Sequence, residues 1–212
     1  MPNDDQYFVS GRASQVARRA GKSARAKAAE ELAAAPVRNR IARLIGAHTD
    51  ERAWRRGGDG EERMANILGR LPQGWHVFHD LPIGARGANV DHLVIGPAGV
   101  FTINTKNLTG RVWVASKALL VNGKKTAYLP KAVREAAAVS ASLTRASGRP
   151  VLAVPLLAVF AESLTIKSEP THVWVVRSSE VTAWFKRRPV VLPPSECFAI
   201  ARAADDPKTW RD

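Results

Sequence analysis

The sequence has little of what disulfide-bonded, zinc-binding and membrane-spanning proteins need. Its 212 residues include a single cysteine, Cys197, which excludes an intramolecular disulfide framework. The histidines do not lie at the short sequence spacings that zinc ligands usually have, so a zinc site is not expected either. The longest apolar run, residues 151–161, is broken by Pro155 and falls short of the roughly 18 residues that span a bilayer. No secretory signal and no internal repeat is visible, and we expect a cytoplasmic protein without a membrane partner.

Acidic residues are also scarce. The chain has 19 Asp and Glu against 32 Lys and Arg, a formal net charge of +13 and a pI of about 10.7. Such an excess favours a polyanionic partner, and we expect DNA, with RNA as the alternative. Twelve basic and four acidic residues lie between residues 11 and 56, so this Ala- and Arg-rich segment holds eight of the thirteen net charges.

The length and the charge distribution predict two parts. We expect a basic helical extension over residues 1–55 and one α/β domain over residues 56–212. The extension has few apolar side chains, which leaves three interpretations open: a long surface helix that binds nucleic acid, a partly disordered arm, or a merely solvated basic helix.

The stretch Asn89–Asn107, NVDHLVIGPAGVFTINTKN, predicts a β-hairpin with polar groups in an apolar setting. Two β-branched and apolar runs flank a Gly-Pro-Ala-Gly turn. If the turn carries no bulge, Asp91 lies opposite Asn104 at about 5 Å, and Lys106 shares their face of the sheet. An acid, an amide oxygen and a cation gathered on one face can hold a divalent ion and a phosphate. The alternative is that these are solvated surface groups.

A helix is predicted upstream of the hairpin. Asp59 fits the N-cap and Glu62 the third helical position of a capping box. An amphipathic stripe follows at helical spacing, formed by Met64, Ile67, Leu68 and Leu71. Glu62 points away from this stripe, whereas Glu61 lies near its edge and faces the protein body. Glu61 is therefore either a functional acid or a half-buried glutamate satisfied by a backbone amide or an arginine.

These motifs, taken in order, resemble the nuclease-related domain (NERD) family within the PD-(D/E)xK nuclease superfamily. They are Gly60-Glu61, Val90-Asp91-His92, the Gly-Pro-x-Gly-Val-Phe turn and Asn104-Thr105-Lys106. The resemblance is specific over residues 56–110 and looser to about residue 160. It implies an α/β, restriction-endonuclease-like core, in which a mixed central β-sheet is flanked by helices.

The resemblance also implies roles for individual residues. Glu61, Asp91 and Lys106 correspond to the catalytic acids and lysine, and Asp91, Asn104 and the Thr105 carbonyl to metal ligands. Magnesium suits such a site, because it takes oxygen ligands and keeps several waters. Asn104 departs from the superfamily pattern, which has Asp or Glu there. The implied function is metal-dependent hydrolysis of DNA. The alternatives are a nucleic-acid-binding module that has lost the metal site and a structural partner-binding protein.

The remaining pattern predicts further α/β elements. Expected strands cover residues 75–81, 111–115, 118–121, 151–160 and 172–176, and Asn122-Gly123 predicts a hairpin turn. Expected helices cover residues 130–146, a segment after Ser178 or Ser179, and residues 194–204. On the first of these helices, Lys131 and Arg134 either face a nucleic-acid backbone or are solvated charges.

Overall fold

The computed structural model of the protein describes residues 50–83 and 88–211, together with Lys22, Arg25, Ala26 and Ala29. The predicted basic extension over residues 1–55 therefore falls largely outside the described residues. Within the described residues, no helix combines the length and the apolar character needed to cross a bilayer.

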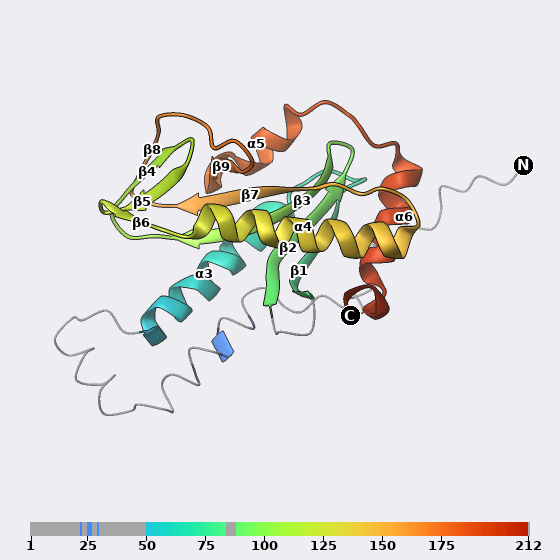
Figure 1. Ribbon diagram of the computed structural model, residues 1–212, viewed down its shortest axis with the longest axis horizontal. Helices are drawn as coiled ribbons and strands as arrows, with labels where there is room; N and C mark the ends of the chain where they lie inside the picture. The colour runs from blue at the N-terminus through green and yellow to red at the C-terminus, as the bar shows by residue number, and fades with distance from the viewer. Residues whose placement is uncertain (1–21, 23–24, 27–28, 30–49, 84–87, 212) are drawn as a thin grey trace, which may run out of the picture.

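A five-stranded mixed sheet forms the centre of the molecule (Figure 1). Its strands lie in the order β1 (His76–Ile83), β2 (Ala88–Gly96), β3 (Gly99–Asn107), β7 (Ala153–Phe160) and β9 (Trp174–Arg177). Neighbours among the first three strands are antiparallel, whereas β3, β7 and β9 are parallel. Parallel strands need a long crossover connection, and the one between β3 and β7 contains helix α4 (Tyr128–Ser147). The predicted mixed sheet flanked by helices is confirmed.

A second, four-stranded sheet lies at one end of the molecule (Figure 1). Its strands are β6 (Lys124–Lys125), β5 (Ala118–Val121), β4 (Arg111–Ala115) and β8 (Ser163–Ile166), in that order. The predicted turn joins β5 to β6, and its two residues have φ angles of 50° and 81°, the positive values that a type I′ turn requires. Strand β8 was not predicted, because its polar–apolar alternation, Ser-Leu-Thr-Ile, is only four residues long and its side chains are half-buried or exposed.

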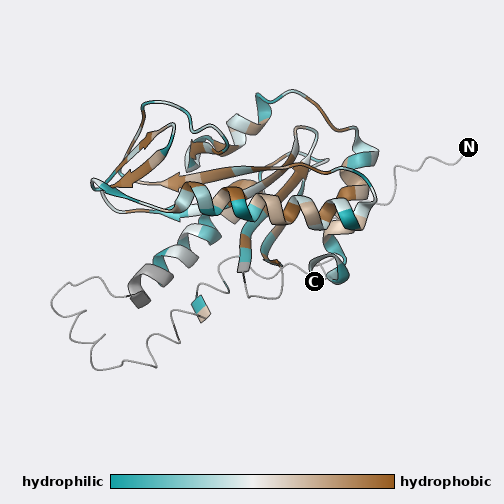
Figure 2. Cartoon of the chain, viewed as in Figure 1, coloured by the Kyte–Doolittle hydropathy of each residue, from teal (hydrophilic) through white to brown (hydrophobic). Residues whose placement is uncertain are grey.

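Helices cover both faces of the five-stranded sheet. Helices α3 (Asp50–Leu68) and α5 (Val181–Lys186) pack on one face around Phe101, and α4 and α6 (Pro194–Asp205) pack on the other around Val139. Figure 2 shows that apolar residues concentrate in the central strands between these layers. Strands covered on both faces are normally apolar throughout, so polar side chains in β2 and β3 need a reason. Two short 3₁₀ helices complete the described chain: η2 (Ser178–Glu180) and η3 (Pro207–Trp210).

Helix α3 begins at Asp50, so the helix start that the capping pattern predicted at Asp59 is wrong. The helix continues through residues 57–60, three of which are glycines, although a glycine within a helix costs about 1 kcal/mol relative to alanine. One of them has a steric reason: a Cβ on Gly60 would lie 2.9 Å from Asn107 Cβ. Glycine therefore lets α3 approach β3 closely, and this packing outweighs the local signals for a helix end.

Candidate functional site

The β2–β3 hairpin has the register that the sequence predicts. His92 pairs with Ile103, and all pairs from there to the turn keep the same register without a bulge. The backbone ladder stops at this pair. One step further, Asp91 Oδ2 accepts a hydrogen bond from the backbone N–H of Thr105 at 2.6 Å. Asp91 thus contacts β3 through its side chain, at the point where the two strands part.

The Lys106 ammonium group lies among oxygen atoms and an aromatic ring. Its Nζ donates hydrogen bonds to Asn104 Oδ1 and, at 3.2 Å, to the carbonyl oxygen of Thr105. Nζ also lies 5.0 Å from the centre of the Tyr128 ring, within cation–π range. Burial lowers the pKa of Lys106, and the nearby Asp91 carboxylate opposes that shift. The two neutral oxygens expected to bind a metal therefore converge on one cationic group.

The Asp91 carboxyl group is close to charges of both signs. Burial raises the pKa of Asp91, and the neighbouring Asp80 adds to the rise. Lys106, the backbone N–H of Thr105 and the charge of Lys131 all act in the opposite direction. A buried charge persists only where partners offset its lost hydration, so Asp91 and Lys106 stabilise each other. Carboxyl and amino groups with such shifted pKa values cluster at functional sites.

Glu135 on α4 is a buried acid of this site that the sequence interpretation missed. Its Oε2 accepts a hydrogen bond from Asn104 Nδ2 at 2.8 Å, and its Oε1 lies 3.1 Å from Lys131 Nζ. A signal was present in the sequence, because Glu135 falls within the buried and mostly apolar stripe of α4. Of the two residues expected to face a nucleic-acid backbone, Arg134 is exposed, and Lys131 is exposed but paired with Glu135.

Asp80 is a second acid beside Asp91. It is fully buried on β1, has a φ of 49° and accepts a hydrogen bond from Asn89. Its backbone changes the alternation of the strand, because Phe78 and Leu81 are three residues apart and yet pack in the same core. A left-handed conformation at a residue other than glycine costs roughly 1–3 kcal/mol and is often found at functional sites.

Glu61, the expected helix acid, is buried beside the end of β3. It is 9% exposed, and the adjacent Gly60 places α3 against Thr105 and Asn107. The charge of Glu61 acts to raise the pKa of Lys106, so the two side chains lie within electrostatic reach of each other. Helix α3 thus brings a carboxylate to the strand end that carries the lysine.

His79 and His92 form a neutral pair behind the site. Their Nδ1 atoms are 2.9 Å apart, so one ring donates the hydrogen bond and the other accepts it. Burial lowers the pKa of both side chains, and that of the fully buried His92 lies well below its ordinary value. His92 is fully buried, on the strand that also carries Asp91.

The donors at the end of β3 suit a hard divalent cation in their chemistry but carry little charge. Asp91, Asn104 Oδ1 and the Thr105 carbonyl supply oxygen atoms, which Mg²⁺ prefers. Only the first is anionic, and across residues 50–83 and 88–211 no three Asp, Glu, His or Cys side chains gather as a metal site. This donor set fits an ion that also takes ligands from a substrate phosphate, rather than one enclosed by protein.

A helix acid, a strand acid and a strand lysine at one end of a mixed α/β sheet are consistent with a nuclease-like core. The family model of the nuclease-related domain matches residues 56–161, half of the chain, and the chain belongs to this family. Membership indicates a nuclease-related function and interaction with nucleic acid. No curated protein and no solved structure matches the chain.

Proposed function

We propose that the chain is a magnesium-dependent phosphodiesterase that hydrolyses DNA at the site formed by Asp91, Asn104 and Lys106. The observation that carries the proposal is the Lys106 ammonium group, half-buried beside Asp91 and bonded to Asn104 Oδ1 and the Thr105 carbonyl. A lysine held this way at a strand end, within the segment that the nuclease-related domain model matches, supports a role in binding phosphate.

Each residue has a distinct task in this proposal. Lys106 donates N–H groups to the phosphoryl oxygens, whose negative charge increases in the transition state. The backbone N–H of Thr105 fixes the Asp91 carboxylate, which, with Asn104 Oδ1 and the Thr105 carbonyl, would hold Mg²⁺. When bound, the ion polarises the phosphate and makes a coordinated water more acidic. Glu61 adds negative charge near Lys106, which favours the protonated lysine.

The charge of the molecule supports a nucleic-acid substrate. A formal net charge of +13 attracts a polyanion over long range. On α4, Lys131 is exposed and close enough to Asp91 to lower its pKa, and Arg134 is exposed three residues further along the helix. We assign them to the sugar–phosphate backbone, with Lys131 exchanging its contact to Glu135 for a phosphate.

A second candidate is a nucleic-acid-binding domain without catalysis. It is favoured by Asn104, whose amide group is engaged at both ends: Nδ2 donates to Glu135, and Oδ1 accepts from Lys106. In this arrangement the lysine takes the place that a cation would occupy at the amide oxygen. The site would then recognise a phosphate without cleaving it.

The deciding experiment compares DNA cleavage in Mg²⁺ and in EDTA for the wild-type chain and for Asp91→Asn and Lys106→Gln. Both substitutions preserve size, and both should lower the cleavage rate by at least about 10²-fold, the usual effect of removing one transition-state donor or ligand. Lys117→Gln, at an exposed turn outside the site, should cleave as the wild type does. Wild-type protein that binds DNA without Mg²⁺-dependent cleavage would support the second candidate instead.

A further inference from the structure

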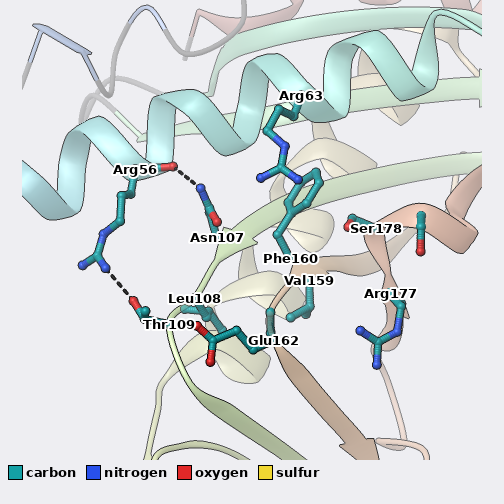
Figure 3. A pocket seen from close by; sticks show the side chains of 12 residues that line it. Arg56, Arg63, Asn107, Leu108, Thr109, Val159, Phe160, Glu162, Arg177 and Ser178 are labelled. Atoms are coloured by element: carbon teal, nitrogen blue, oxygen red, sulfur yellow. Dashed lines mark hydrogen bonds between the residues drawn. The ribbon is translucent and has the colours of Figure 1, made fainter.

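Figure 3 shows a hollow lined by three arginines at the edge of the sheet. Its lining includes Asn107, the residue after Lys106, but not Lys106 itself. The hollow is formed where β3 ends at Asn107, β7 at Phe160 and β9 at Arg177. These three strands are parallel, so their carboxyl ends share one edge, and this is where α/β sheets usually bind ligands. Its volume of about 500 Å³ lies within the range of ligand-binding pockets.

Helix α3 supplies two of the arginines. Arg56, Gly60 and Arg63 are spaced at i, i+4 and i+7, so they share one side of the helix, the side on which Gly60 touches β3. Arg56 is fixed by a 2.5 Å hydrogen bond to Thr109 Oγ1, and its carbonyl accepts a bond from Asn107 Nδ2 at 3.0 Å. The close approach that Gly60 permits therefore also positions the arginines at the hollow.

The guanidinium groups of Arg63 and Arg177 are only partly engaged by neighbouring groups. The Arg63 guanidinium stacks on Phe160 at 4.1 Å from the ring centre, which leaves its edge N–H groups available. Arg177 makes one long bond, 3.4 Å, to the Leu164 carbonyl. Neither forms an ion pair with an acid in the part of the chain that the structure describes, including Glu162, which lines the same hollow.

We propose that this arginine pocket, defined by Arg56, Arg63 and Arg177, binds a phosphate group of a nucleic-acid strand. Guanidinium groups match phosphate with paired hydrogen bonds, and stacking on Phe160 pre-orients Arg63 for that geometry. The buried Ser178 and the side chain of Asn107 add neutral donors to the same hollow (Figure 3).

The pocket and the Lys106 site are positioned for one strand. Lys106 and Asn107 are neighbours on β3, and consecutive side chains of a strand point to opposite faces of its sheet. A nucleic-acid strand that crosses the sheet edge there can place one phosphate at Lys106 and another among the arginines. This assignment rests on the proposed nucleic-acid function and adds a positioning site that holds the strand in register.

The test measures the affinity of the full-length chain for a single-stranded DNA oligonucleotide in EDTA, so that binding is read without cleavage. Arg63→Gln and Arg177→Gln should each weaken binding by roughly tenfold, as expected for loss of a charged hydrogen bond. Each should also flatten the slope of log K against log salt by about 0.7. Arg111→Gln, an exposed arginine on β4, is the matched control and should change neither quantity.

Two further measurements test whether the arginine pocket recognises a phosphate group. Arg63→Lys keeps the charge and most of the packing on Phe160, so an affinity between those of wild type and Arg63→Gln supports paired recognition of phosphate. Inorganic phosphate should compete with the oligonucleotide in the wild type and compete less well in Arg177→Gln.

The outcomes separate this proposal from the function on which it rests. Wild-type affinity in Arg63→Gln and Arg177→Gln, with weaker binding in a Lys131→Gln/Arg134→Gln variant, would overturn the pocket and leave the nucleic-acid function intact. A wild-type chain that binds no oligonucleotide would overturn both. A third outcome is that a thermal shift shows binding of a free deoxynucleotide while the oligonucleotide does not bind. That result would assign the pocket to a small phosphate ligand and would also overturn the proposal.

Discussion

Asn104 is the residue on which the chemistry of the site depends. The nuclease superfamily pattern that the sequence resembles has an acid at this position, and the structure places a different acid within hydrogen-bond distance of Asn104: Glu135 Oε2 accepts from Asn104 Nδ2 at 2.8 Å. A carboxylate thus reaches this part of the site from α4 instead of β3. The Asn104 amide also bridges Lys106 and Glu135, because its oxygen accepts a hydrogen bond from Lys106 and its nitrogen donates one to Glu135.

This arrangement predicts the effect of restoring the acid. Asn104→Asp puts two buried carboxylates where a hydrogen bond was, so in EDTA it should reduce the free energy of unfolding by roughly 1–3 kcal/mol. Mg²⁺ should recover that loss and bind more tightly than to the wild type. The double variant Asn104→Asp/Glu135→Gln restores a donor–acceptor pair and should be nearly as stable as the wild type in EDTA.

Urea unfolding measures the change in the free energy of unfolding, and calorimetric titration measures the change in Mg²⁺ affinity. An unchanged Mg²⁺ affinity in Asn104→Asp would exclude residue 104 as a ligand.

The His79–His92 pair predicts how stability depends on pH. The pKa of each is lowered from 6.5 in the folded chain, so below about pH 6.5 the unfolded chain takes up protons that the folded chain does not. The histidines therefore do not reduce the free energy of unfolding above that pH. On acidification below it, the free energy of unfolding falls by up to about 1.4 kcal/mol per pH unit for each histidine. Urea unfolding at a series of pH values should show a smaller acid loss in His79→Gln than in the wild type. The exposed His172→Gln variant should retain the wild-type loss, and an equal loss in all three proteins would contradict the assignment.

At the scale of elements, the contact between α3 and β3 holds the site together. Gly60 allows the contact, Glu61 lies on α3 within electrostatic reach of Lys106, and Arg56 and Arg63 lie on the same helix. An alanine at a helical glycine usually stabilises by up to about 1 kcal/mol. At Gly60 the sign should reverse, because the new Cβ would lie 2.9 Å from the Asn107 Cβ, in a packed region.

Gly60→Ala should therefore lower the free energy of unfolding by roughly 1–3 kcal/mol, the usual cost of overpacking. Gly69→Ala provides the comparison, since a Cβ there meets nothing closer than 3.4 Å and should leave stability unchanged or slightly raised. Thermal or urea unfolding of the two variants checks this, and a stabilised Gly60→Ala protein would show that α3 can move away from β3 without cost.

The local elements of this fold were largely predictable, but the contacts between distant elements were not. The register of β2 and β3 followed from the short turn between them, because a hairpin turn without a bulge fixes which residues pair. The start of α3 at Asp50 did not follow, since its glycines signal a helix end unless the packing on β3 is known. The helical stripe of α4 marked Glu135 as a buried position, but its partner Asn104 lies 31 residues away on β3 and could not be predicted from that pattern.

At the scale of the whole molecule, basic groups surround one edge of the sheet. Lys106 and Lys131 lie on one side of the end of β3, and Arg56 and Arg63 lie along α3 on the other. The described residues account for only part of the net charge, since residues 11–56 hold eight of the thirteen excess positive charges. Arg25 connects the two parts, with ion pairs to Asp59 at 3.3 Å and to Glu62 at 2.7 Å.

This distribution predicts what removing residues 1–49 should do. The Arg25 ion pairs are largely exposed, and such pairs contribute about 0–1 kcal/mol, so the chain from Asp50 onward should still fold. Its DNA affinity should depend less on salt, because each lost phosphate contact changes the slope of log K against log salt by about 0.9. We expect a slope flatter by several units, measured by fluorescence anisotropy at a series of salt concentrations. Lys131→Gln/Arg134→Gln in the full chain should change the slope by no more than about two, because only two charges are lost. Equal slopes for the full and shortened chains would mean that the first 49 residues contact no phosphate, and that DNA binding depends on the sheet edge alone.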